Sequence, residues 1–245
     1  RFPYLTIMNE NANKGWNGSN GVTEQSVGAD NLQWEKAIKL DLGIEGKLFN
    51  EQVDFTVDFF RDTRNDIFQQ RTMVPDYIGL AEQPFGNVGS MVSYGADGNI
   101  SFRQDIGKDF SFTLRGNFTY TANMVKNWEE AFQKYSYQER ADKPYEFYSG
   151  YIALGLFRDE NDVKFSPDQS GIAGRKVLPG DIKYKDVNGD GVINSDDQVP
   201  LSYKANYPRL MYGFGGEVRW KKLTLGFLFK GTGNVHNFCV DGYKA

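Results

Sequence analysis

The sequence has 245 residues, and 28 Lys and Arg against 32 Asp and Glu give a formal net charge of −4. This balance gives no reason to expect a nucleic-acid partner. The only cysteine, Cys239, excludes an internal disulfide framework. Mean hydropathy is −0.56 and no apolar run is long enough for a membrane-spanning helix. A membrane β-barrel remains possible, because its strands alternate apolar and polar residues and therefore look soluble on average.

Five stretches alternate apolar and polar residues with a period of two, which predicts strands with one apolar face. In chain order they are residues 38–44, 53–59, 110–120, 212–220 and 223–229. A further strand is expected around residues 100–102. Aromatic residues make up 15% of the sequence, with 19 Phe and 14 Tyr, which is more than an ordinary core needs.

The connections between these strands differ in length. Short turns are expected near residues 46–51, 105–109 and 219–222, whereas roughly residues 62–90 and 122–205 form long connections. Short turns at one end and long loops at the other, with strands of about ten residues, are typical of an outer-membrane barrel. The fold class predicted is therefore all-β, an antiparallel transmembrane β-barrel segment with long extracellular loops. A soluble β-sandwich is the alternative.

One segment of the second long connection has a helical pattern. In "NWEEAFQKYSYQERADK", residues 127–143, Trp128, Phe132 and Tyr135 recur at helical spacing. We expect a solvated helix there, whose aromatic stripe packs on the rest of the loop.

A calcium-type loop is predicted within "YKDVNGDGVINSDDQVP", residues 184–200. Oxygen-bearing side chains fall at positions 1, 3, 5, 9 and 12 of an EF-hand template, with Gly191 at position 6 for the sharp bend. The expected ligands are Asp186, Asn188, Asp190, the carbonyl of Val192, Asn194 and Asp197. The alternative interpretation is that Asp, Asn and Gly here only form turns. Position 12 is Asp rather than Glu, so the shorter side chain predicts modest affinity.

No pattern supports an enzyme. His236 is the only histidine, and with Cys239 it supplies two ligands where zinc needs three or four. Phosphate-binding glycine motifs are absent. The carboxylates of residues 159–162 are expected to lie in a solvated loop rather than to form an acid/base pair.

Five blocks of the sequence, in order, resemble SusC/RagA-type TonB-dependent outer-membrane transporters. They are "NLQWEKAIKLDLGIEGKLF", "NVGSMVSYGADGNISF", "GYIALGLF", "PGDIKYKDVNGDGVINSDDQVP" and "YPRLMYGFGGEVRWKKLTLGFLFKGTGN". The resemblance covers residues 31–234 and falls in the C-terminal half of that family's barrel.

The resemblance implies a plugged barrel of about 22 strands, of which this chain holds about ten. Residues 1–245 are then the C-terminal part of one barrel, and the plug, the TonB-contacting segment and the first strands are expected before Arg1. The implied function is import of a glycan or peptide across a Gram-negative outer membrane, with a SusD-like lipoprotein and TonB as partners. The acidic loop would belong to an extracellular connection that faces the lipoprotein. A soluble, secreted calcium-binding adhesion or dockerin-like module is the alternative function.

The implied barrel predicts which residues meet lipid. We expect the apolar face, represented by six residues, to contact the outer-membrane lipid: Phe55, Phe112, Phe118, Phe214, Leu225 and Phe227. The lumen is expected to receive Lys39, Asp41, Arg115 and Arg219.

Overall fold

The computed structural model describes residues 3–11, 21–29, 31–75, 78, 82–204 and 207–236. These residues fall into two compact units. The first takes in the chain up to residue 131 together with 140–145 and 208–235, and the second takes in 132–139 and 146–207. We call them the sheet unit and the loop unit. Cys239 lies outside the described residues.

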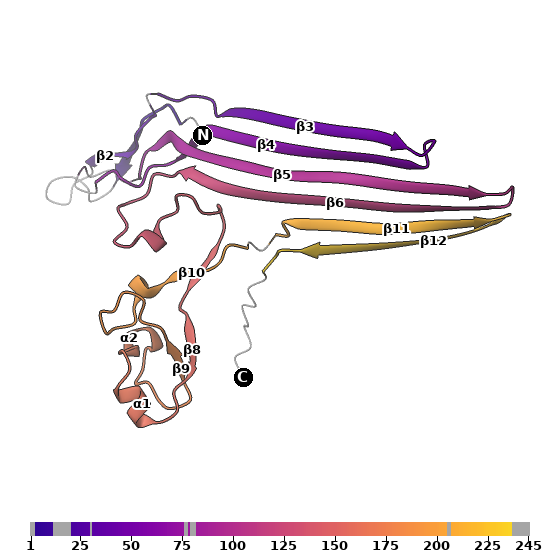
Figure 1. The fold of residues 1–245 in the computed structure, drawn as a ribbon. Coiled ribbons are helices and arrows are strands. Elements are labelled where there is room, and N and C mark those ends of the chain that lie inside the picture. The colour runs from indigo at the N-terminus through magenta and orange to yellow at the C-terminus, as the bar shows by residue number, and fades with distance from the viewer. Residues whose placement is uncertain are drawn as a thin grey trace. The chain divides into compact units, whose positions relative to one another are not determined.

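The sheet unit is built on a six-stranded antiparallel sheet with the order β12-β11-β6-β5-β4-β3 (Figure 1). Its strands are β3 (Lys36–Leu48), β4 (Val53–Gln70), β5 (Phe85–Ile106), β6 (Phe110–Asn127), β11 (Leu210–Trp220) and β12 (Leu223–Gly233). A small second sheet pairs β1 (Ile7–Asn11) with β2 (Gly21–Ser26). The prediction of an all-β, antiparallel fold is confirmed.

The pairing register gives the large sheet one apolar face. Residues directly opposite each other share a face, and one such row runs Leu42, Phe59, Ala96, Tyr120 and Leu210. A row five positions further along β3 lies on the opposite face and is polar. It contains Lys47, Asp54, Ser101 and Arg115. The register places all ten residues of the predicted lipid and lumen sets on the faces expected of them.

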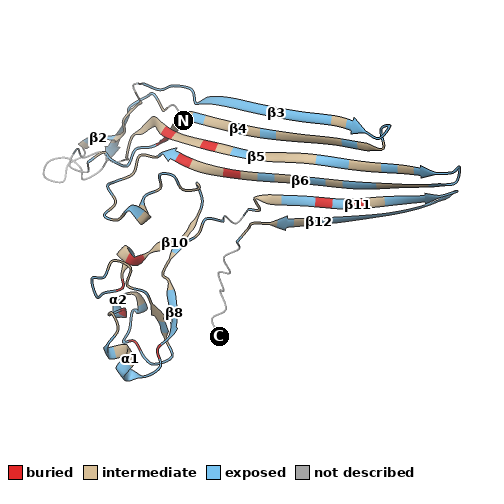
Figure 2. Cartoon of the chain, in the orientation of Figure 1, coloured by how far each residue is buried: buried red, intermediate tan, exposed pale blue. Residues whose placement is uncertain are grey.

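The apolar face is largely open to the surroundings in this chain. Leu225 is 72% exposed and Leu40 is 68% exposed. Figure 2 shows the outer strands mainly in the colours of intermediate and exposed residues. A contiguous apolar surface of this extent marks a face that normally meets something other than water. Contact with lipid stays a prediction.

Glycines on this face lie beneath aromatic rings of the neighbouring strand. A Cβ at Gly46 would stand 2.9 Å from the Phe55 ring, and one at Gly216 would stand 2.9 Å from the Phe227 ring. Both glycines are directly opposite these aromatic residues in the ladder. Each ring therefore covers its partner's backbone, and a larger residue would displace the ring.

Several strands are longer than the ten residues expected. β11 and β12 have 11 residues each, but β4 has 18 and β5 has 22. The alternating pattern marked only the apolar band, whereas the ladder continues beyond it through polar residues to the pair Gln70 and Phe85. A bulge at Asp66, with φ of 58°, interrupts the register on the way. The predicted connection 62–90 is accordingly reduced to residues 71–84.

The contrast between short turns and long connections is confirmed. The turns occupy residues 49–52, 107–109 and 221–222, and residues 128–209 form the longest connection. In the first turn Phe49, Asn50 and Glu51 all have positive φ, which is unusual for consecutive residues other than glycine. The described residues hold twelve strands, six of them in the large sheet. This sheet is open, with β3 and β12 at its edges.

The helix predicted for residues 127–143 is wrong. The segment contains only the 3₁₀ turn η3 (Ser136–Gln138). Its carboxylates make contacts that a helix would not allow: Glu129 pairs with Arg71 of another segment, and the Glu130 carboxylate accepts the N–H of Arg140, ten residues further on, at 2.7 Å. Phe132 is 92% exposed, so no buried apolar stripe stabilises a helix there.

The loop unit holds two short antiparallel pairs. β7 (Tyr148–Gly150) pairs with β10 (Val199–Ser202), and β8 (Ala153–Leu156) pairs with β9 (Ile182–Tyr184). Two short helices, α1 (Glu160–Lys164) and α2 (Ser170–Ala173), lie between β8 and β9 in the chain. Among the described residues of this unit, the buried apolar side chains are few, namely Phe157, Val177 and Ile193.

In the described part of the chain, no helix is both long enough and apolar enough to span a membrane.

The two faces of β12 provide a test of the apolar surface. Arg at Leu225 should destabilise the chain in lipid by about 2–4 kcal/mol if the residue lies near the bilayer midplane, whereas Arg at Thr224 should cost little. Unfolding free energies of the full-length protein in lipid vesicles, measured by denaturant titration, would show the difference. Equal costs at these adjacent residues would mean that the apolar face does not contact lipid.

Candidate metal centre in the loop unit

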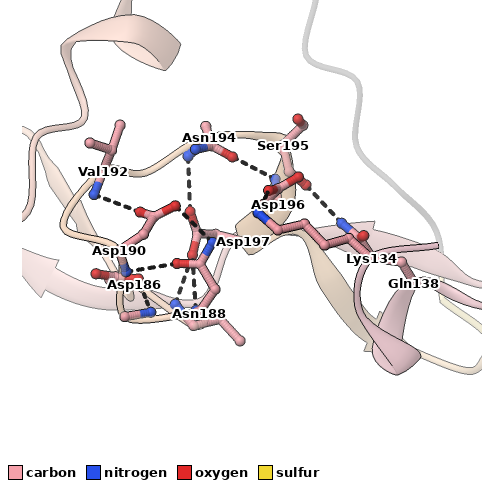
Figure 3. Close-up of polar contacts among 12 residues, drawn as sticks. Lys134, Gln138, Asp186, Asn188, Asp190, Val192, Asn194, Ser195, Asp196 and Asp197 are labelled. Carbon is pink, nitrogen blue, oxygen red and sulfur yellow. Dashed lines mark hydrogen bonds and ion pairs between the residues drawn. The ribbon is translucent and has the colours of Figure 1, made fainter.

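The six predicted calcium ligands lie together in one loop between β9 and β10. We call residues 184–200 the acidic loop. Figure 3 shows its polar side chains turned inward over a short stretch of backbone. All six residues are described, and Asp197 is the most buried of them, with no exposed surface.

The first half of the loop is closed by Asp186. Its Oδ1 accepts the Gly189 N–H at 2.6 Å and its Oδ2 accepts the Gly191 N–H at 2.8 Å. The two glycines have φ of 78° and 85°. Because other residues adopt this conformation only with strain, glycine is required where the loop bends. The bend predicted at Gly191 is confirmed.

Asn188 and Asp190 form a second pair of local contacts. The Asn188 amide donates to Asp190 Oδ2 at 2.9 Å, and the Asp190 N–H donates back to Asn188 Oδ1 at 2.9 Å. Asp190 Oδ1 also accepts the Val192 N–H at 2.9 Å. These are Asx-type turns, in which the side chain stabilises its own backbone.

The second half of the loop is organised around Asp197. Its Oδ1 accepts the Val187 N–H at 2.8 Å, and its Oδ2 accepts the Asn194 N–H at 2.9 Å. Asn194 in turn accepts the Asp196 N–H at 2.7 Å and starts the 3₁₀ turn η4 (Ser195–Asp197) as a capping box. Asp197 thus joins the two ends of the acidic loop through backbone groups that are ten and three residues away.

A segment that the sequence did not indicate holds the loop from outside. Lys134 Nζ forms an ion pair with Asp196 at 3.0 Å, and the Tyr137 hydroxyl donates to the Asp196 carbonyl. Gln138 donates to the Ser195 carbonyl at 3.2 Å. The pKa of Lys134 is raised, mainly by a hydrogen bond with Tyr135 and next by the hydrogen bond with Asp196. No local pattern links residues 134–138 to 195–196, because they are about sixty positions apart.

Backbone pairing fixes the loop on a third side. Ile193 donates to the Asp168 carbonyl at 2.8 Å, and Asp168 donates to the Gly191 carbonyl at 3.0 Å. The Ile193 side chain is 1% exposed and belongs to the small core of the loop unit. The acidic loop is therefore held in place by its neighbours as well as by its own carboxylates.

The donor set can be compared with the needs of a cation. Among the described residues, no group of three or more His, Cys, Asp or Glu side chains meets the geometry of a metal site. The carboxylates face backbone N–H groups instead. Each ionised carboxylate still has about four lone-pair positions, so an oxygen that accepts one N–H keeps capacity for a cation. The residue types fit calcium, and its binding stays a proposal.

The other carboxylates singled out from the sequence have structural contacts. Asp159 caps α1 by accepting the Asp162 N–H at 2.8 Å, and Asp162 forms an ion pair with Lys183 at 2.8 Å. The Lys183 hydrogen bond lowers the Asp162 pKa. A general acid would need a raised pKa, so this arrangement agrees with the prediction that residues 159–162 are not an acid/base pair.

Comparison with known proteins places these features in a family. Residues 1–242 match the family described as TonB dependent receptor-like, beta-barrel. The chain is 25% identical over 235 residues to TonB-dependent receptor P3 of Formosa agariphila, covering 90% of this chain and 23% of that protein. It is 24% identical over 217 residues to TonB-dependent receptor SusC of Bacteroides thetaiotaomicron, covering 84% and 20%.

Solved structures share the fold. The RagAB peptide importer in its open-open state superposes with a TM-score of 0.67 at 20% identity, over 94% of this chain and 24% of that chain. The closed-closed state gives a TM-score of 0.62 at 22% identity. The chain thus spans about a quarter of the length of the proteins that it matches.

Removing the central carboxylate should loosen the acidic loop. Asp197→Ala leaves the Val187 and Asn194 N–H groups without their acceptor, which should lower the local opening free energy by roughly 3 kcal/mol. Asp196→Ala is the matched control, because it removes only the ion pair with the exposed Lys134 side chain and should have a much smaller effect. Hydrogen exchange of residues 184–200 reports both. Similar protection in the two variants would contradict the central role of Asp197.

Proposed function

We propose, on the premise that this chain belongs to the TonB-dependent receptor β-barrel family, that it forms part of the wall of an outer-membrane transporter that imports nutrients. The family match over residues 1–242 carries this proposal. Its members are outer-membrane receptors and transporters, a class that fits the prediction of no enzymatic activity.

The two faces of the large sheet support a wall. An apolar face with Leu40, Phe214 and Leu225 suits lipid, and a polar face with Asp41 and Arg115 suits a water-filled lumen. The open edges at β3 and β12 leave backbone groups for further strands of a closed barrel. A soluble calcium-binding or dockerin-like module would have to cover this apolar face in another way, and the comparisons give that alternative no support.

The energy source, the partner protein and the transported substrate are also part of the proposed function. We propose uptake of a glycan or a peptide, driven by TonB through parts of the protein outside this chain, together with a SusD-like surface lipoprotein. Similarity to SusC and to the RagAB peptide importer supports a transporter of this kind. The loop unit, in the long connection 128–209, is the proposed site of contact with the lipoprotein.

Growth of a deletion strain would test the transport function. A strain of the source bacterium without the full-length gene should grow normally on simple sugars and lose growth on one polysaccharide or peptide mixture. Plasmid-borne wild-type protein should restore it, and a variant without the TonB-contacting segment should not. Unchanged growth and unchanged uptake of labelled polymers across the panel would contradict the function.

Calcium binding by the acidic loop is the second part of the proposal. The cation would be held by Asp186, Asn188, Asp190, the Val192 carbonyl and Asp197, with Asn194 direct or through water. A site with this many oxygen donors suits calcium better than magnesium, because magnesium tends to keep its bound waters. The expected calcium–oxygen distances are about 2.3–2.6 Å. The ion would offset the negative charge of the loop and stiffen it.

Titration with calcium would separate this proposal from a loop closed by hydrogen bonds alone. The purified full-length protein should bind calcium in calorimetry, and chelation should speed hydrogen exchange in residues 184–200. Asp190→Ala should abolish both effects without preventing barrel assembly, and Glu160→Ala, an exposed carboxylate of the same unit, should change neither. If hydrogen exchange of residues 184–200 is the same with calcium and with chelator, the loop is closed by hydrogen bonds alone and does not bind calcium.

A further inference from the structure

The loop unit contains a pocket that is separate from the acidic loop's ligand positions. Its volume is about 330 Å³, at the lower end of the range for small-molecule sites. It lies between β9 and the segment that runs from α2 to Asp181. Its lining includes Tyr151, Gln169, Ile172, Arg175, Asp181 and Tyr184.

A buried amide fixes one wall of this pocket. Gln169 is 3% exposed, and its Nε2 donates to the Ile182 carbonyl at 2.7 Å. Its Oε1 accepts the Tyr184 N–H at 3.2 Å. Both ends of the side chain therefore hold the backbone of β9, so the wall is formed before any ligand arrives. Such preorganisation reduces the entropy lost on binding.

A bidentate ion pair also lines the pocket. Arg175 Nη2 contacts Asp181 Oδ1 at 2.7 Å, and Nη1 contacts Oδ2 at 3.0 Å. Asp181 Oδ2 also accepts the Leu178 N–H at 2.9 Å, which fixes the carboxylate. The pair has no net charge but presents N–H donors and carboxylate acceptors side by side. The hydrogen bond with Arg175 lowers the Asp181 pKa, so the pair is ionised at neutral pH.

Two tyrosines supply flat apolar surface. The ring centroids of Tyr151 and Tyr184 are 5.4 Å apart with an interplanar angle of 49°. The Tyr151 hydroxyl accepts the Gln198 amide N–H at 3.1 Å, which restrains that ring. Ile172 of α2 adds an aliphatic contact. The lining of the pocket thus combines aromatic and aliphatic surface with hydrogen-bonding groups.

We propose that this pocket binds one neutral sugar ring. A pyranose has an apolar C–H face for the tyrosines. Its vicinal hydroxyls each donate and accept, which matches the donors and acceptors of Arg175 and Asp181. An inorganic anion would need a net positive site, and a cation a net negative one. The pocket's place in uptake rests on the transport function proposed above, whereas its ligand chemistry does not.

Binding to the detergent-solubilised full-length protein tests the pocket directly. The probes are the methyl glycosides of glucose, galactose and mannose, with glycyl-tyrosine and inorganic phosphate for comparison. Saturation-transfer NMR and calorimetry should show that at least one glycoside binds, while dipeptide and phosphate do not. Arg175→Ala should weaken the glycoside about tenfold or more, the scale of one charge-assisted hydrogen bond.

Two further variants distinguish a loss of binding from misfolding of the loop unit. Ala173→Trp fills the pocket from its rim without removing a contact, and should block the glycoside while leaving hydrogen exchange elsewhere in the loop unit unchanged. Lys176→Ala changes a neighbouring exposed charge that does not line the pocket, and should have no effect.

Three results would overturn the proposal. The first is that no glycoside binds, and the second is that a glycoside binds equally well to the wild type and to Ala173→Trp. The third is that the dipeptide or phosphate binds and that this binding is reduced in Arg175→Ala and Ala173→Trp. Because the assay needs no transport, its failure is distinct from normal growth of the deletion strain.

Discussion

The register of the six-stranded ladder is the constraint on which the rest of this chain depends. Side chains alternate with a period of two, so a slip of one residue in any strand would move its apolar set to the polar face. The pairing from β3 to β12 keeps Leu42, Phe59 and Tyr120 in one row, and it places charged residues such as Lys47, Asp54 and Arg115 on the opposite face. One face can then meet lipid while the other meets water, and the wall of a transporter becomes possible.

The loop unit is stabilised in a different way. It has few buried apolar side chains, and Phe157, Val177 and Ile193 are the ones described. Polar side chains that bind backbone groups take over part of the role of a core. Asp197 and Gln169, both almost fully buried, each satisfy two backbone groups. Such contacts fix loop geometry because an unpaired buried polar group is costly.

This difference between the units has a functional consequence. The sheet unit follows a repeating pattern that any sequence with the right alternation can satisfy, so it defines a wall rather than a specific site. The loop unit depends on individual residues, such as the glycines of the acidic loop and the Arg175–Asp181 pair. Connections of this kind commonly carry binding residues in proteins, because regular elements hold them in position.

The sequence by itself determined the presence of the six strands of the large sheet, their apolar and polar faces, the short turns and the sharp bend at Gly191. These features depend on period-two alternation and on backbone conformations that only certain residues adopt. It overestimated local order in residues 127–143, where Glu129 and Glu130 bind Arg71 and the backbone of Arg140 rather than a helix of their own. Only the tertiary structure decided how far the strands extend past the apolar band, which segment holds Asp196, and which residues face the pocket beside β9. Those outcomes depend on contacts between residues far apart in the chain, and no local pattern encodes them.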